Sequence, residues 1–191
     1  VSSGATNPCL SQEETWAGAG LNLYTFLTNV PVGHLGPVTA PCASATDCYQ
    51  VGYQAGINAF ADAQATGVNT NVTWWLDVEG PSSYWTDNQA LNAQTVQGAI
   101  DALRGTEGIT TVGIYASPLT WNQIVGAYQP PVPYWMADWV TPNPNSFDHG
   151  LRQRLRDSIL PRFSRRHGAL LMNLSRAACC AATEPAFVVS L

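Results

Sequence analysis

The clearest strand in the sequence is Val72-Thr73-Trp74-Trp75-Leu76-Asp77-Val78-Glu79, a nearly continuous apolar run that ends in two carboxylates. Continuous apolarity over this length is typical of a buried parallel strand that is covered by helices. Asp77 and Glu79 are two residues apart, so their side chains point to the same face of a strand. The stretch therefore predicts a central strand with an acidic pair at its carboxyl end.

Strand-like and helix-like patterns alternate on both sides of this stretch. The elements we expect are a strand at 21–27, a loop at 28–45, a helix at 47–65, the strand at 72–79, a loop at 80–88, a helix at 91–104, a strand at 110–116, a short helix at 118–125 and a strand at 133–139. Such alternation indicates an α/β fold with a parallel sheet. Polar and aromatic residues gather where the strands end, which favours an incomplete (β/α)8 TIM-type barrel, since a complete one needs about 250 residues.

Composition excludes several classes of function. The chain has 191 residues, 46% of them apolar and 11% charged, with seven Trp, seven Tyr and no lysine. A net charge of −5 argues against a nucleic-acid partner bound through its phosphates. No apolar run approaches the roughly 18 residues of a membrane span. We expect a globular monomer without membrane insertion.

Charge divides the chain into two parts. Residues 1–150 carry 11 acidic residues and one cation, Arg104, for a net charge of −10, whereas residues 151–191 carry seven arginines and two acids, for +5. We therefore expect a partial barrel domain at 1–149 and an arginine-rich tail of doubtful origin at 150–191. A basic interaction tail, a membrane-surface helix and a reading-frame error each explain the tail.

The cysteines and histidines give no metal-ligand spacing, because no CxxC occurs and the three His are scattered. We expect neither a metal nor a cofactor. Cys42 and Cys48 bracket a short loop and could pair, which leaves Cys9 in need of a partner. The chain opens at Val1 without a start methionine or a signal-peptide pattern, so we expect a piece whose beginning is missing.

The acidic pair suits acid–base chemistry. Trp75 lies on the same side of the strand, one pleat deeper, and an apolar neighbour disfavours an ionised carboxylate, as does an adjacent negative charge. One of the two carboxyls should then hold its proton to higher pH, as an acid catalyst at a glycosidic oxygen requires. Aromatic residues in or beside the loops after three strands suit stacking on sugar rings; they are Tyr84, Trp85, Tyr115, Trp121, Trp135 and Trp139.

A purely structural interpretation stays open beside the catalytic one. An Asp-x-Glu pair at a strand end also serves to cap the loop that follows. Aromatic residues more often belong to the core than to a ligand site, and Trp74 and Trp135 are the first candidates for the core.

Three segments together resemble the family-25 glycoside hydrolases, the secreted bacterial muramidase-type lysozymes. They are residues 74–79, residues 112–117 with Trp121, and residues 134–139. The chain is similar to a divergent bacterial branch of that superfamily, whose members have an Asn-Pro-Cys segment like residues 7–9. The resemblance covers roughly residues 5–145.

The resemblance implies a barrel that cleaves the β-1,4 bond between N-acetylmuramic acid and N-acetylglucosamine in peptidoglycan. It assigns Glu79 as general acid and then base. Asp77 would orient the substrate's own 2-acetamido group, which acts as the nucleophile, so that no metal or cofactor is needed. The protein would be secreted or associated with the cell wall.

The substrate-binding residues expected on this basis are Tyr115, Asp138, Trp139, Trp75 and Trp85. The family also has a first strand with an Asp, and two later strands with aromatic and acidic residues, for which this sequence shows no counterpart. These departures keep two alternatives open, a glycan-binding barrel without catalysis and an inactive fragment.

Overall fold

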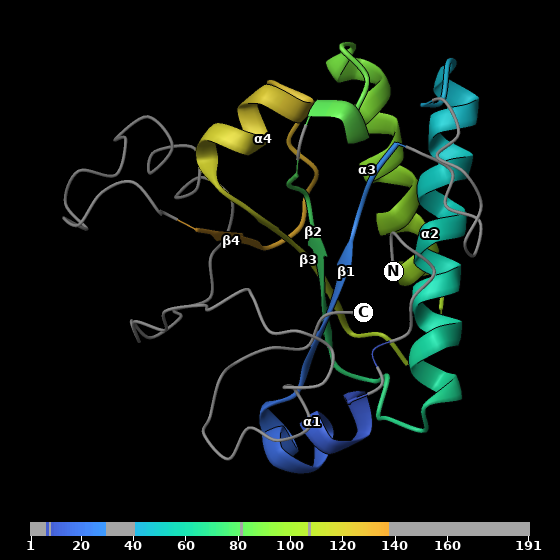
Figure 1. Cartoon of the computed structure of the whole chain (residues 1–191), viewed down its shortest axis with the longest axis vertical. Coiled ribbons are helices and arrows are strands. Elements are labelled where there is room, and N and C mark those ends of the chain that lie inside the picture. Colours follow the sequence, from blue (N-terminus) through green and yellow to red (C-terminus); the bar gives the residue numbers. More distant parts are fainter. Residues whose placement is uncertain (1–6, 8, 30–40, 81, 107, 138–191) are drawn as a thin grey trace, which may run out of the picture.

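A computed structural model describes residues 7, 9–29, 41–80, 82–106 and 108–137 (Figure 1). In this part of the chain four strands form one sheet: β1 (Asn22–Phe26), β2 (Thr73–Asp77), β3 (Thr111–Ala116) and β4 (Tyr134–Met136). All neighbours are parallel, and the strand order is β1-β2-β3-β4. The predicted α/β class with a parallel sheet is confirmed. Consecutive strands lie side by side, as in a barrel, and closure of a barrel is not seen among the described residues.

Three helices connect the strands, namely α2 (Ala45–Ala65), α3 (Gln89–Arg104) and α4 (Pro118–Val125). α2 and α3 begin two residues earlier than the apolar pattern predicts. Their starts are set by polar N-cap residues, which lie outside the apolar pattern. The Ser44 hydroxyl accepts from the Asp47 backbone N–H at 3.1 Å, and the Asn88 side chain accepts from the backbone N–H groups of Ala90 and Leu91. The predicted bounds of α4 are confirmed.

One helix and two 3₁₀ turns were not predicted from the sequence. A short helix, α1 (Leu10–Ala17), leads into a 3₁₀ turn at Gly18–Gly20, and a second such turn lies at Ser82–Tyr84. In α1 only Leu10 is buried, so the helix has no apolar period to reveal it. It lies below the amino end of β1 in Figure 1.

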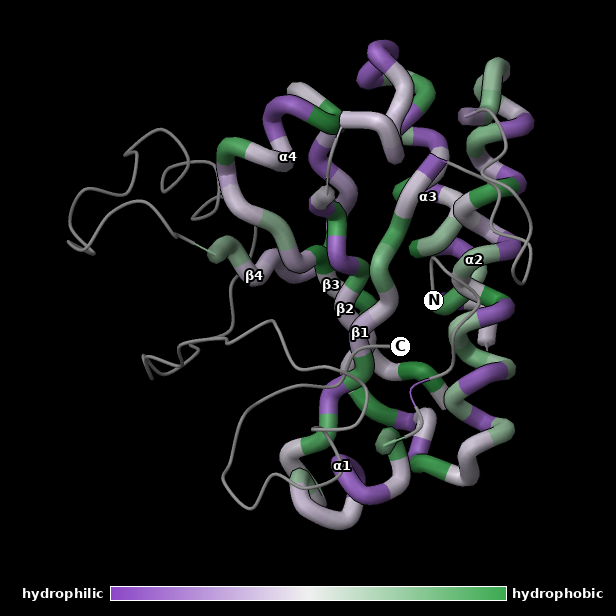
Figure 2. The backbone as a smooth tube through the Cα atoms, in the orientation of Figure 1, coloured by the Kyte–Doolittle hydropathy of each residue, from purple (hydrophilic) through white to green (hydrophobic). Residues whose placement is uncertain are grey.

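The helices α2 and α3 cover one face of the sheet (Figure 1). Trp74 and Leu76 of β2 point to this face and are fully buried, together with Ile100 of α3. The prediction that Trp74 belongs to the core is confirmed. The alternate residues of β2 are half-buried, so within the described chain this strand is covered by helices on one side. In Figure 2, α2 alternates hydrophilic and hydrophobic segments along its length, as a helix with one buried face does.

The helices α2 and α3 pack so closely that the backbone of each contacts a glycine of the other. A Cβ atom added to Gly98 of α3 would lie 2.1 Å from the carbonyl oxygen of Tyr49 in α2, and one added to Gly52 would lie 1.8 Å from that of Thr95. Small residues at this contact thus set the distance between the helices.

Cys42 and Cys48 form a disulfide, the pairing that their spacing in the sequence left possible. The bond joins the segment before α2 to the first turn of that helix, and both side chains are buried. The expected tail at 150–191 lies outside the described residues.

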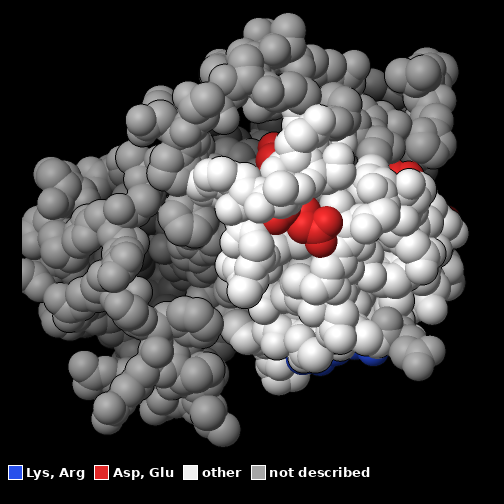
Figure 3. All heavy atoms as spheres, turned by 90° about the horizontal axis from the view of Figure 1, so that it is seen from below, with Lys and Arg blue, Asp and Glu red and all other residues white. Residues whose placement is uncertain are grey.

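Charged side chains are sparse on the described surface. Arg104 is the one lysine or arginine among the described residues, and on the face drawn in Figure 3 a small acidic group stands in an otherwise largely uncharged surface.

Candidate active site

The parallel register brings acidic and aromatic side chains to one face of the sheet. Asp77 of β2 is paired with Tyr115 of β3, and Tyr115 is paired with Trp135 of β4. Trp75, one pleat deeper on β2, is paired with Tyr24 of β1. Register partners on neighbouring strands share a face. These five side chains therefore lie opposite the face that packs against α2 and α3.

Four aromatic rings, one from each strand, form a cluster on this face. The ring centroid of Trp135 lies 5.3 Å from that of Tyr115, 5.7 Å from that of Trp75 and 5.8 Å from that of Tyr24, in edge-to-face arrangements. Trp135 is 39% exposed, so its assignment to the core is wrong. The cluster forms an aromatic surface beside Asp77, in which Trp135 is the most exposed ring and Tyr115 is itself buried, at 3% exposed. Edge-to-face packing holds the rings in fixed orientations.

Asp77 occupies the carboxyl end of β2 within this aromatic surface. Its Oδ1 atom is buried and has no hydrogen-bond partner. Burial, and next the negative charge of Glu79, raise the pKa of Asp77 to about 7. Both causes were expected from the sequence, which predicted that one carboxyl of the pair would hold its proton to higher pH.

Glu79 lies just beyond β2, which ends at Asp77 rather than at Glu79. The chain turns at Gly80, whose φ of +97° only glycine adopts readily. Burial raises the pKa of Glu79, while an interaction of its carboxylate with the backbone N–H of Ser117 acts in the opposite direction. Ser117 is the N-cap of α4, so the ends of β2 and β3 meet at this carboxylate.

Trp85 lies outside the aromatic cluster, in the hydrophobic core. It is only 5% exposed, and its indole N–H donates to the backbone oxygen of Glu79 at 2.9 Å. The structure thus ties Trp85 to the main chain of Glu79, and its predicted contact with substrate stays a prediction. Asp138 and Trp139 lie outside the described residues.

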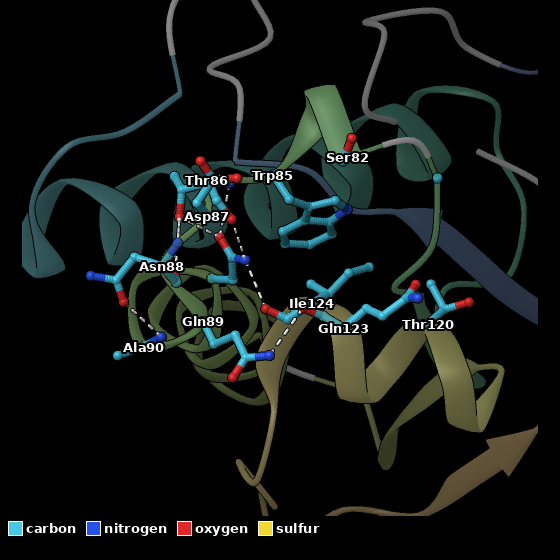
Figure 4. Close-up of a pocket in the computed structure, with 12 residues that line it drawn as sticks. Ser82, Trp85, Thr86, Asp87, Asn88, Gln89, Ala90, Thr120, Gln123 and Ile124 are labelled. Atoms are coloured by element: carbon cyan, nitrogen blue, oxygen red, sulfur yellow. Dashed lines mark hydrogen bonds between the residues drawn. The ribbon is translucent and has the colours of Figure 1, made fainter.

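A cavity of about 800 Å³ lies at the carboxyl edge of the sheet, between the loop after β2 and the helices α3 and α4 (Figure 4). Its lining consists of Gly80, Ser82, Trp85, Thr86, Asp87, Asn88, Gln89, Ala90, Asn92, Thr120, Gln123 and Ile124. Many of its polar groups already bond to one another or to nearby backbone. The Gln89 amide, for example, donates to the backbone oxygen of Asn122 at 2.8 Å.

Sequence reasoning missed Tyr24 and Ser117 as members of the site. Tyr24 stands between Leu23 and Thr25, which are buried, and this alternation marks it as facing the other side of β1. Its proximity to Asp77 depends on the pairing of β1 with β2. Ser117 contributes a backbone group, which no side-chain pattern reveals.

Within the described ranges, no three His, Cys, Asp or Glu side chains gather as they would around a metal ion. In the same part of the chain, no helix combines the length and the apolarity that crossing a membrane requires.

Comparison with known proteins gives the family. Residues 39–149, more than half of the chain, match the family model described as lysozyme-like protein 1. The chain belongs to this lysozyme-like family. Two relatives from Dictyostelium discoideum are similar to it. Probable GH family 25 lysozyme 5 is 39% identical over 67 residues, which is 34% of this chain and 31% of the relative. Probable GH family 25 lysozyme 3 is 30% identical over 170 residues, which is 78% of this chain and 34% of the relative.

The lysozyme-like family fits the resemblance that the sequence motifs indicated, and the matched residues include both carboxylates and the strands β2, β3 and β4. The chain spans about a third of the length of the curated relatives it matches. No solved structure matches it. Both relatives come from Dictyostelium, so the bacterial branch stays a prediction.

Proposed function

We propose that this chain is a glycoside hydrolase of the muramidase type, which acts on peptidoglycan. The observation that carries the proposal is the acidic pair at the carboxyl end of β2, where Asp77 and Glu79 both have raised pKa values beside an aromatic surface. Membership of a lysozyme-like family supports the same class of substrate. Aromatic faces and carboxyl groups are the means by which such enzymes bind and cleave sugars.

In the proposed reaction Glu79 donates its proton to the oxygen of the glycosidic bond as that bond breaks. The carbonyl oxygen of the substrate's 2-acetamido group attacks the anomeric carbon and forms a cyclic intermediate. Asp77 accepts a hydrogen bond from the N–H of that group. Its negative charge stabilises the positive charge that develops on the group. Glu79, now ionised, removes a proton from the water that opens the ring, so the enzyme returns to its starting state.

The unpartnered Oδ1 of Asp77 supports the assigned role. In the free protein this oxygen lacks a donor, and the pKa of Asp77 is raised to about 7. A substrate N–H that donates to Asp77 would favour its ionised form. Because the charge of Glu79 acts on Asp77, ionisation of Asp77 on binding of substrate would favour protonation of Glu79. The acid needed for bond cleavage is then formed when substrate is present.

Tyr115 and Trp75 would line the sugar site from the aromatic surface, with Trp85, Asp138 and Trp139 as further proposed contacts. We propose that the four parallel strands are part of a (β/α)8 barrel domain at 1–149, in a monomer that is secreted or associated with the cell wall. The arginine-rich residues 150–191 are proposed as a separate tail of doubtful origin.

The test compares Glu79→Gln with the unaltered chain on insoluble peptidoglycan, with turbidity and the release of reducing ends as measurements. Loss of a general acid lowers the rate by about 10²- to 10⁴-fold. Asp47→Asn is the matched control, because it removes an exposed carboxylate in the first turn of α2, which lines neither the cavity nor the aromatic surface. It should retain nearly full activity.

Equal clearing by Glu79→Gln and by the unaltered chain would contradict the role of Glu79. Binding of soluble peptidoglycan fragments without any release of reducing ends would instead indicate a glycan-binding barrel that does not catalyse.

A further inference from the structure

Asn92 of α3 joins the loops at the carboxyl edge of the sheet, although it lies outside the aromatic surface. Its side-chain oxygen accepts from the Asn29 amide, from the Thr86 backbone N–H at 3.1 Å and from the Thr86 hydroxyl at 2.8 Å. Its NH₂ group donates to the backbone oxygens of Thr86 at 3.0 Å and Ile124 at 2.7 Å. One side chain therefore connects the segment after β1, the loop after β2 and the helix α4.

Both ends of this network lead to Glu79. Thr86 follows Trp85, whose indole N–H donates to the backbone oxygen of Glu79. Ile124 belongs to α4, whose N-cap Ser117 directs its backbone N–H at the Glu79 carboxylate. Asn92 is thus bonded to the loop after β2, which holds the main chain of Glu79 through Trp85, and to α4, which holds the Glu79 side chain through Ser117.

The Asn92 side chain at the centre of this network is buried and fully bonded. Asn92 is 1% exposed, and every hydrogen-bonding group of its amide has a partner. A buried polar network of this kind fixes one geometry, since a loop that moved would leave buried groups without partners. An apolar residue at position 92 could fill the space but could not connect the three segments.

We propose that Asn92 is a positioning residue for catalysis, one that sets the placement of Glu79 through Thr86 and Trp85 on one side and α4 on the other. This inference rests on the proposed function, since it concerns the same acid. Asn92 does not touch the reacting atoms. It determines whether Glu79 keeps the position and the Ser117 contact that the reaction needs.

The test uses Asn92→Asp in the complete chain, because Asp keeps the size and the acceptor but replaces the NH₂ donor with oxygen. We expect kcat on peptidoglycan to fall about 10- to 100-fold, as a small displacement of a catalytic group does, while KM changes less than about twofold because substrate contacts remain. We also expect the alkaline limb of the pH profile to move to higher pH. Loss of the Ser117 N–H would raise the pKa of the Glu79 acid.

Thr95→Val is the matched control. Thr95 lies on α3 one turn after Asn92, is equally buried and contacts Cys42, with 4.0 Å between Oγ1 and Sγ, but it takes no part in the Asn92 network. This control should lose some stability and keep both kcat and the pH profile. If Asn92→Asp does not fold, Thr86→Val removes the hydroxyl contact to Asn92 at constant size. It should lower kcat and move the alkaline limb of the pH profile to higher pH, as expected for Asn92→Asp.

Titration of the Glu79 carboxyl by NMR in each variant separates this inference from the proposed function. An upward shift of the Glu79 pKa in Asn92→Asp supports the positioning role even if the chain does not clear peptidoglycan. An unchanged Glu79 titration, with kcat and melting temperature lowered only as in Thr95→Val, would overturn it. Failure of the proposed function would show instead as equal rates for Glu79→Gln and the unaltered chain.

Discussion

At the scale of single residues, Asp77 reduces stability in the free protein. Its buried Oδ1 has no hydrogen-bond donor, and burial together with the negative charge of Glu79 favours the neutral acid, so the pKa is raised to about 7. Buried carboxyls with shifted pKa values concentrate at functional sites, where catalysis requires an arrangement that lowers the stability of the fold.

The raised pKa predicts a specific dependence of stability on pH. The folded protein holds the Asp77 proton up to about pH 7, whereas the unfolded chain releases it near the ordinary value of 3.8. The stability contribution of the protonated acid is therefore complete below about pH 4 and is lost as pH rises through 7. Asp77→Asn, which resembles the neutral acid at every pH, should be more stable than the unaltered chain at pH 8, by up to about 4 kcal/mol.

Urea unfolding at pH 4 and pH 8 measures this effect. The difference between Asp77→Asn and the unaltered chain should nearly vanish at pH 4. Asp87→Asn, which removes an exposed carboxylate, should differ little at either pH. An equal gain for Asp77→Asn at both pH values would exclude titration of Asp77 as the cause.

At the scale of elements, the contact between α2 and α3 fixes where the loop after β2 ends. Gly98 lets the two helices approach until its Cα faces the backbone of Tyr49 and Tyr53. The first turn of α3, which carries Asn92, is placed by the same packing.

Gly98→Ala tests that contact. Alanine favours a helix over glycine by about 1 kcal/mol, but its Cβ would lie 2.1 Å from a backbone oxygen that cannot move without shifting α2. We expect the steric effect to dominate and the free energy of unfolding to fall by about 1–3 kcal/mol. Gly20→Ala is the control, since a Cβ there meets nothing within 4 Å. A chain stabilised by Gly98→Ala, measured by urea unfolding, would show that the helices separate easily.

At the scale of the whole molecule, the disulfide between Cys42 and Cys48 acts on the unfolded chain as well as on the fold. It closes a short loop of sequence separation 6, next to the backbone hydrogen bond from Cys42 to the Asn29 carbonyl. Cross-linking residues this close removes a limited amount of chain entropy from the unfolded state.

Replacing both cysteines, as Cys42→Ala with Cys48→Ala, should therefore lower the free energy of unfolding by about 2 kcal/mol. Chemical denaturation of the double variant without reductant measures the loss while the other cysteines stay as they are. A loss near zero would mean that native contacts alone hold this segment. Thr95→Val serves as the control for the Cys42 contact with α3.

The sequence determined much of this protein by itself. The apolar run that ends in Asp77 and Glu79 indicated the central strand and its acidic edge, and the β/α alternation indicated a parallel sheet, because periodicity and strand-end polarity are local properties of the chain. Spacing allowed the Cys42–Cys48 pair without deciding it, and the structure shows the bond. The helix α1 was not predicted, since a helix that buries only Leu10 leaves no periodic signal.

Tertiary structure decided what surrounds the acids. The pairing of β1 and β4 with the inner strands brought Tyr24 near Asp77 and Trp135 against Trp75 and Tyr115. Tertiary structure left Trp135 exposed, although the sequence had made it a candidate for the core. It also placed Trp85 behind Glu79 and directed the Ser117 backbone toward the Glu79 carboxylate. These contacts join residues from different strands and loops, so they depend on strand register and helix packing. A pattern read along one chain contains no information about either.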